Sequence, residues 1–325
     1  MNKLLIIVLA AWGGLTVSCS TPAEAPVAPA AAAPAAAPAP DFTIVALPDT
    51  QIYARDYPQI FQAQTDWIIA QRTNLNIVYV AHLGDITDGG DKLPEQWLPA
   101  TNAMYRLEDP ALTGLPDGIP YGIMPGNHDH LGGTEKYQAY FGRDHFARHH
   151  YFGGSMTAAN QNHYDLLTAG GMDFVMVYID FNYNDPTLDY PAIDAWADGV
   201  LTQYANRRAI VVSHDILKAN GDWDPRGQAI YDKLKHHANL FLMLCGHNSG
   251  ESHRMDLEAG HRVDSCLSDY QSDVRGGDGY LRLYEFSPAN NVIRVKTYSP
   301  SQHQYRTNAA SAYEFTYPMT GGAKP

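Results

Sequence analysis

The feature that most constrains the fold of this chain is an alternation of short, β-branched apolar runs with stretches of helical period. Runs of strand length occur at residues 42–47, 76–81, 121–124, 174–179, 209–212 and 240–245. The stretches between them predict helices at 58–72, 94–107, 190–205 and 226–237. The first two helices open on a proline, where the missing N–H costs no helical hydrogen bond. This order predicts a sheet flanked by helices.

The pattern changes after residue 245, where only strand signals follow. The runs 280–286 and 292–298 flank a Ser-Pro-Ala-Asn-Asn segment, which predicts a β-hairpin. Together, the two patterns predict an α/β fold with two packed, mixed β-sheets and helices outside them. The segment 130–171 is rich in Gly, His, Tyr and Phe with little periodicity, and it predicts a loop over the functional site or a solvated insertion.

The N-terminal segment has the features of an export signal. Residues 1–18 combine a short basic start, an apolar run too brief to span a bilayer and small residues before Cys19. Residues 15–19 are similar to a bacterial lipobox, which predicts a lipid on Cys19, with secretion without a lipid as the alternative. The Ala/Pro-rich stretch up to residue 40 predicts an extended tether. We therefore expect an exported envelope lipoprotein, in the periplasm or on the outer membrane.

This organisation places a single catalytic domain at residues 41–318, followed by a flexible tail at 319–325. Contact with the membrane is expected only through the N-terminal lipid. Cys245 and Cys266 each follow or end a strand-like run, so they could pair in an oxidising compartment or remain as two buried thiols. The sequence leaves both alternatives open.

The charge balance excludes one class of partner. The chain has 35 acidic and 22 basic residues, for a formal net charge of −13. Binding of nucleic acid requires a basic surface that displaces counterions, so we expect no nucleic-acid partner. A small phosphorylated substrate remains compatible, because bound divalent ions would reverse the local potential.

Polar clusters follow five of the apolar runs, at the edge where α/β sheets place their sites. Their sequences are Leu-Pro-Asp-Thr-Gln (47–51), Leu-Gly-Asp-Ile-Thr-Asp (83–88), Pro-Gly-Asn-His-Asp (125–129), Val-Ser-His-Asp (212–215) and Cys-Gly-His-Asn-Ser (245–249). These carboxylates, amides and imidazoles suit a pair of divalent ions that share a bridging carboxylate. Hydrolysis of a phosphate ester uses such a pair to activate water and to neutralise the phosphoryl oxygens, and an imidazole can protonate the leaving group.

The ordered set of motifs resembles the calcineurin-like metallophosphoesterases. Their usual pattern is Asp-x-His, Gly-Asp-x-x-Asp, Gly-Asn-His-Asp/Glu, His and Gly-His-x-His, and the resemblance covers residues 49–247. It implies a four-layer sandwich, two divalent ions (Mn, Fe, Zn or Mg) and hydrolysis of phosphate monoesters or diesters. It implies that His128 is a general acid or stabilises the transition state, and that Asp129 orients its ring. The implied metal ligands are Asp85 as the bridge, Asn127, His214 and His247 for one ion, and Asp49 and Gln51 for the other.

Two departures from that pattern affect the ion at Asp49 and Gln51, which we call the first ion. Gln51 replaces a histidine, and Ser249 stands where the second histidine of Gly-His-x-His would be. An amide oxygen is a harder and weaker ligand, so this site is expected to be weak and to prefer manganese, magnesium or calcium. His253 could complete the site if the chain folds back.

An exported bacterial subgroup of the family is similar in further motifs. They are Asp-Thr-Gln (49–51), Gly-Glu-x-x-Arg (250–254), Asp-Tyr-Gln (269–271) and Tyr-Ser-Pro (298–300). Gln51 is therefore a subgroup trait, while Ser249 stays unexplained. Arg254 could bind the substrate phosphate or form a surface salt bridge. Asp269, with two aspartates that follow it, could form a calcium loop, although the spacing fits no EF-hand.

These features predict a metal-dependent phosphoesterase that acts on a small phosphorylated substrate or an envelope component. The alternative is a catalytically weak surface lipoprotein that keeps one ion and binds a phosphorylated glycan or lipid. The His128-Asp129 pair disfavours this alternative, because a binding protein does not need a proton donor.

Overall fold

A computed structural model describes residues 1, 8–15, 39–183, 185 and 187–319. The chain divides into two units, Met1–Ala37 and Pro38–Pro325, and the fold below is that of the second. Cys19, most of the predicted tether and residues 320–325 lie outside the described residues. Within the described ranges, no helix is long and apolar enough to cross a membrane.

The described strands form two mixed sheets, as predicted, and each sheet has seven strands. The first has the order β13-β12-β11-β1-β2-β3, with β14 also paired to β12, and the second has the order β4-β5-β6-β7-β8-β10-β9. The strands of the first sheet are β1 (Phe42–Leu47), β2 (Ile77–His82), β3 (Tyr121–Gly122), β11 (Leu281–Ser287), β12 (Val292–Ser299), β13 (Gln304–Arg306) and β14 (Tyr313–Thr316). Those of the second are β4 (Phe152–Ser155), β5 (His163–Ala169), β6 (Met172–Ile179), β7 (Arg208–Ser213), β8 (Leu240–Cys245), β9 (Gly250–Glu258) and β10 (His261–Asp269).

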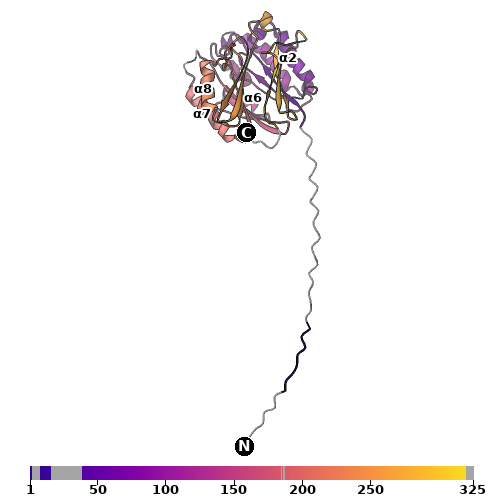
Figure 1. Cartoon of the computed structure of the whole chain (residues 1–325). Coiled ribbons are helices and arrows are strands. Elements are labelled where there is room, and N and C mark those ends of the chain that lie inside the picture. The colour runs from indigo at the N-terminus through magenta and orange to yellow at the C-terminus, as the bar shows by residue number, and fades with distance from the viewer. Residues whose placement is uncertain (2–7, 16–38, 184, 186, 320–325) are drawn as a thin grey trace. The chain divides into compact units, whose positions relative to one another are not determined.

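Helices cover the outer face of each sheet, and the inner faces pack together. The α-helices are α1 (Gln51–Asp56), α2 (Pro58–Gln71), α3 (Trp97–Met104), α4 (Pro110–Thr113), α5 (Glu135–Phe141), α6 (Arg143–Phe146), α7 (Tyr190–Gln203) and α8 (Pro225–Leu234). Four short 3-10 helices complete the described set: Gly90–Lys92, Pro94–Gln96, Tyr105–Glu108 and Val274–Gly276. Figure 1 shows α2 on one side of the strands and α7 and α8 on the other.

Successive side chains of the central strands point to opposite faces of the sheet, which explains this layering. In β1, Ile44 lies in the core between the two sheets, whereas its neighbour Val45 packs with residues of α2 and α3. Successive side chains of a strand point to opposite faces, and here both faces are covered. In the second sheet, Val212 faces the inner core and Val211 packs with residues of α7 and α8. The domain therefore has four layers, with its largest buried surface between the sheets.

The predicted elements are largely confirmed, with two corrections. The segment 130–171 is not a loop, because it contains α5, α6, β4 and the seven-residue β5, which pairs with β6. Its alternation of buried and partly exposed residues is a strand signal that polar residues obscured in the sequence. The helix predicted at 94–107 is a 3-10 turn followed by α3 and a second 3-10 turn. Pro99 lies in the first turn of α3, where its missing N–H is tolerated.

Cys245 and Cys266 are buried free thiols, which is one of the two alternatives that the sequence left open. They lie on the neighbouring strands β8 and β10, where Leu267 is opposite Cys245 and Cys266 is opposite Leu244. This offset by one residue places the thiols on opposite faces of the sheet, so they cannot pair. The side chain of Met319, which the sequence placed in the flexible tail, is buried against the core.

Candidate metal centre

Segments that follow parallel strands of both sheets bring the predicted ligands together. In the first sheet β1 runs parallel to β2, and in the second β7 runs parallel to β8. Parallel strands end at the same edge of a sheet, so the segments after them converge. The segments after β1, β2 and β3 carry Asp49, Gln51, Asp85 and Asn127, and those after β7 and β8 carry His214 and His247.

Three of these side chains have a buried oxygen without a hydrogen-bond partner among the described residues. They are Gln51 Oε1, Asp85 Oδ2 and Asn127 Oδ1. A buried polar atom without a partner costs about 1–3 kcal/mol, so such atoms are rare unless they serve a ligand. All three are oxygens of the kind that divalent cations accept. The side chains therefore fit the pair of ions that the sequence predicts.

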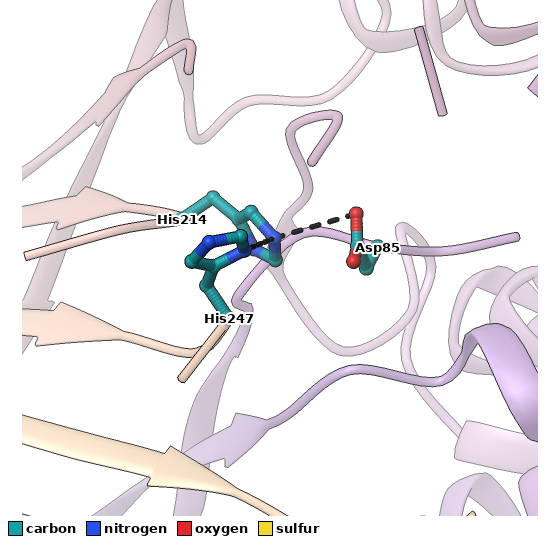
Figure 2. A group of neighbouring side chains, drawn as sticks. All are labelled: Asp85, His214 and His247. Carbon is teal, nitrogen blue, oxygen red and sulfur yellow. Dashed lines mark hydrogen bonds and ion pairs between the residues drawn. The ribbon is translucent and has the colours of Figure 1, made fainter. Parts of the chain in front are cut away.

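The two histidines meet Asp85 at the centre of the site (Figure 2). One donor atom each from Asp85, His214 and His247 lie within 4.8 Å of one another. His214 Nε2 is 3.3 Å from Asp85 Oδ1 and 3.2 Å from His247 Nδ1, while its Nδ1 donates to the Leu83 carbonyl at 2.8 Å. The bond to Leu83 fixes the ring and leaves Nε2 for a cation, as in other histidine ligands.

The electrostatics of this cluster favour a positive charge at its centre. Burial alone would lower the pKa of His214, but the Asp85 and Asp49 carboxylates outweigh it and raise that pKa to about 10. Burial and the neighbouring His214 lower the pKa of His247 to about 4. The protein thus holds one proton where two imidazoles and a carboxylate converge, and a metal ion can replace that proton.

The backbone is strained at the ligands and closely packed behind them. Asp85 and His247 have φ values of 49° and 69°, in the left-handed region that non-glycine residues rarely adopt. A Cβ atom at Gly126 would lie 2.2 Å from Asp85 Oδ1, and one at Gly246 would lie 2.0 Å from Asp49 Oδ1. Glycine is required at both positions because the backbone passes so close to a ligand oxygen.

His128 is held by a partner other than the one predicted. Its Nδ1 donates to the Asp88 backbone carbonyl at 2.8 Å, and the Asp88 carboxylate is 3.3 Å away. The His128 backbone N–H donates to Asp85 Oδ1 at 2.9 Å, which places the ring beside the metal ligands. With Nδ1 bound to Asp88, Nε2 is the ring atom left to exchange a proton with a substrate.

Asp129 does not orient the His128 ring, contrary to the expectation from the family pattern. Its two oxygens accept hydrogen bonds of 2.8–2.9 Å from the backbone N–H groups of Ile86, Thr87 and Gly126, and from the Thr87 hydroxyl. It is fully buried, and burial with the nearby Asp85 raises its pKa to about 6. Asp129 therefore joins the loops that carry Asp85 and Asn127.

The sequence profile of one family fits this architecture and site. The profile described as calcineurin-like phosphoesterase matches residues 42–250, which is more than half of the chain. The chain belongs to the calcineurin-like phosphoesterases. The description of the family as phosphoesterases agrees with a site of carboxylates, amides and imidazoles, which are side chains that can hold divalent ions.

Individual relatives are similar to this chain in sequence or in fold. YvnB, an uncharacterized protein of Bacillus subtilis (strain 168), is 37% identical over 275 residues, which are 81% of this chain and 20% of YvnB. The chain thus corresponds to a small part of that longer relative. A dimetal phosphatase from Danio rerio has a TM-score of 0.54 at 12% identity, covering 86% of this chain and 100% of that one. GAP50, the anchor in the inner membrane complex of Plasmodium, has a TM-score of 0.51 at 16% identity, covering 87% and 90%. Both share the fold of this chain.

Asp269 is a residue of this phosphoesterase site that the sequence reading did not assign to it. It ends β10, is 1% exposed and accepts hydrogen bonds from the Gln271 backbone N–H, Gln271 Nε2 and the Ser249 hydroxyl. After burial, its carboxylate is the strongest influence that raises the pKa of Asp49. The sequence offered one indication of this role, which is that Asp269 stands at the end of a strand-like run.

Glu251 and Tyr270, which belong to two of the subgroup motifs, form hydrogen bonds close to the end of β10. Arg282 on β11 is fully buried, and its Nη2 donates to Glu251 Oε1 at 2.5 Å while its Nη1 donates to the Leu267 carbonyl at 3.1 Å. The Tyr270 hydroxyl donates to the same Glu251 oxygen at 2.8 Å. These bonds connect the two sheets directly behind Asp269, so Glu251 and Tyr270 hold the site in place.

Arg254 and His253 do not reach the ligands of the phosphoesterase site. Arg254 makes two hydrogen bonds to Asp256, of 2.7 and 2.8 Å, which is the surface salt bridge that the sequence offered as the alternative. His253 Nε2 lies 2.7 Å from Asp264 Oδ1, and its ring stacks on Tyr313. Both residues lie well along β9, several residues beyond the end that adjoins Asp269. The substrate-binding role of Arg254 therefore has no support in the geometry.

Two aromatic residues border the second-sheet side of the site. Phe181 follows β6, and its ring centroid lies 5.5 Å from that of His247 and 6.1 Å from that of His214. Tyr183 lies 6.0 Å from His247 and is 61% exposed. Tyr137, Phe141 and Phe146, which belong to α5 and α6, are buried in the core between the first sheet and its helices.

Proposed function

We propose that this phosphoesterase holds two divalent ions that share Asp85 and hydrolyses a small phosphorylated substrate or a phosphorylated envelope component. The observation that carries the proposal is the set of three buried oxygens without partners, on Gln51, Asp85 and Asn127, beside two histidines. Other buried atoms of the described residues also lack a partner, but these three belong to segments that converge with His214 and His247 at the ends of the strands. The fold relative from Danio rerio is itself named a dimetal phosphatase.

The roles of the side chains follow from their positions. Asn127, His214 and His247 would hold one ion together with Asp85, and Asp49 and Gln51 would contribute to the other. When bound, the ions supply a water of lowered pKa and neutralise charge on the phosphoryl group. The protein contributes the spacing, since strained loops and close glycine contacts fix Asp85 and Asp49 before any ligand arrives.

His128 is the proton donor in this proposal. Its Nδ1 is engaged by Asp88, so a proton on Nε2 can pass to the oxygen of the departing alcohol. The ring is 36% exposed, which leaves it open to a substrate. Tyr183 and Phe181 offer a flat apolar surface beside His247 for the organic part of the ester.

A metal reconstitution assay tests the proposed function. Chelator-treated protein is expected to lose hydrolysis of p-nitrophenyl phosphate and bis-p-nitrophenyl phosphate, and added Mn²⁺, Mg²⁺, Zn²⁺ or Fe²⁺ is expected to restore it to different extents. The ratio of the hydrolysis rates of the two substrates shows whether the protein prefers monoesters or diesters. Metal binding without turnover on either substrate would instead support the weakly catalytic binding protein.

We also propose that the chain is exported and lipidated at Cys19, which the composition of residues 1–40 supports. A radiolabelled fatty acid is expected to enter the wild-type protein but not Cys19→Ala, and the labelled protein should fractionate with membranes. Cys266→Ala, which changes a buried thiol of the folded unit, serves as the control that retains the label. Equal labelling of wild type and Cys19→Ala would contradict the proposal.

A further inference from the structure

One ligand position of the family pattern is vacant in this sequence, because Ser249 replaces the second histidine of Gly-His-x-His. We propose that Asp269 fills this position, and that its carboxylate binds the first ion together with Asp49, Gln51 and the shared Asp85. The inference rests on the proposed dinuclear centre and assigns a ligand that comes from a different strand than the family pattern uses.

The sheet register brings Asp269 to the edge that carries the other ligands. Strands β8 and β10 are parallel neighbours, with Leu267 opposite Cys245. Asp269 lies two residues beyond Leu267 at the end of β10, and His247 lies two residues beyond Cys245, at which β8 ends. Neighbouring strands lie about 4.8 Å apart, which is within the reach of side chains that share one ion.

Hydrogen bonds place Asp269 and Asp49 on either side of the same residue. The His247 backbone N–H donates to both Asp49 oxygens, at 3.2 and 3.1 Å. The His247 carbonyl accepts from Gln271 Nε2 at 3.3 Å, and that same amide donates to Asp269 Oδ2 at 3.0 Å. The two carboxylates are therefore fixed around one backbone segment.

Burial of several carboxylates favours a cation in this space. Asp49, Asp85 and Asp269 are 3%, 1% and 1% exposed. Three carboxylates that have little contact with water repel one another, and bound cations relieve that repulsion. Gln51 Oε1 is buried without a hydrogen-bond partner among the described residues, which provides an independent sign of a ligand on this side of the site.

Ser249 is a hydrogen-bond donor to Asp269 and is not itself the proposed ligand. The Ser249 hydroxyl lies 3.3 Å from Asp269 Oδ2 and 2.6 Å from the Ser272 hydroxyl. The other candidate from the sequence, His253, is engaged with Asp264. Asp269 does not form a calcium loop with the two aspartates that follow it, because Asp273 pairs with Arg306 and Asp278 pairs with Arg275.

The experiment measures Mn²⁺ binding directly and does not depend on turnover. The full chain is stripped with chelator, and Mn²⁺ is titrated by calorimetry while bound metal is counted by mass spectrometry after dialysis. Wild type is expected to bind two ions per chain. Asp269→Asn and Asp269→Ala are expected to weaken one of the two sites by at least about the 10 to 100-fold that loss of outer-shell support costs. The exposed control Asp273→Asn is expected to keep both ions. Ser249→Ala is expected to weaken the same site less than Asp269→Ala does, because it removes only a hydrogen bond to that carboxylate.

Thermal unfolding in chelator separates loss of a ligand from loss of the fold. Asp269→Asn without metal should be at least as stable as wild type, because one of three repelling carboxylates becomes neutral. Two ions bound with wild-type affinity by folded Asp269→Ala, or only one ion bound by wild type, would overturn the inference. Two ions in wild type and one in Asp269→Ala, without hydrolysis by either protein, would uphold it and refute the proposed function instead.

Discussion

Asp85→Asn is expected to lower the hydrolysis of phosphate esters about 10³-fold or more while the chain remains folded. Metal polarisation contributes several kcal/mol to such reactions, and each 1.4 kcal/mol corresponds to a factor of ten in rate. Asp85 Oδ2 has no hydrogen-bond partner among the described residues, so the carboxylate is free to serve the ions. The change to Asn keeps the shape of the side chain and removes the charge that both ions would share.

The measurement compares kcat/KM of wild type and Asp85→Asn on p-nitrophenyl phosphate at saturating Mn²⁺. Asp144→Asn is the matched control, because the Asp144 side chain is fully exposed. Circular dichroism confirms that each variant is folded. Near-normal turnover by folded Asp85→Asn would be incompatible with a bridging carboxylate at this position.

His128→Ala is expected to lower kcat by about 10²–10⁴-fold on an alkyl phosphate ester, the range that general acid catalysis contributes. The loss should be much smaller on p-nitrophenyl phosphate, because nitrophenolate is stable without a proton. This contrast follows from the position of His128, whose Nδ1 is bound to Asp88 while Nε2 is left for the leaving group.

Paired assays on the two esters check this prediction, with His150→Gln as a control on an exposed histidine that pairs with Asp117. An equal loss on both esters would show that His128 stabilises charge in the transition state and does not donate a proton. Unchanged turnover of the alkyl ester would remove His128 from the reaction altogether.

The local parts of the site could be predicted from the sequence, because each motif follows an apolar run in the chain. The polar clusters that contain Asp49, Asp85, Asn127, His214 and His247 were located in this way, and the family resemblance implied their roles as ligands. The structure brings them together. The same reasoning predicted the two sheets, since strand signals depend on neighbours only two residues apart.

Contacts between distant segments could not be predicted in this way. Asp269 reaches the site because β10 lies next to β8, a pairing that no short stretch of sequence reveals. The family resemblance assigned Asp129 to the His128 ring, yet its carboxylate faces the loop at Ile86, more than 40 residues earlier. Arg254 matched a motif, but its nearest carboxylate was only two residues away.

The origin of the ligands has a mechanical consequence. Asp49 and Asp85 follow strands of the first sheet, whereas His214, His247 and Asp269 follow or end strands of the second. A cation held by ligands from both groups would cross-link the two sheets at the edge where these strands end. The free energy of metal binding then becomes resistance of the two sheets to separation. Depletion of metal would weaken the edge of the domain that carries the ligands.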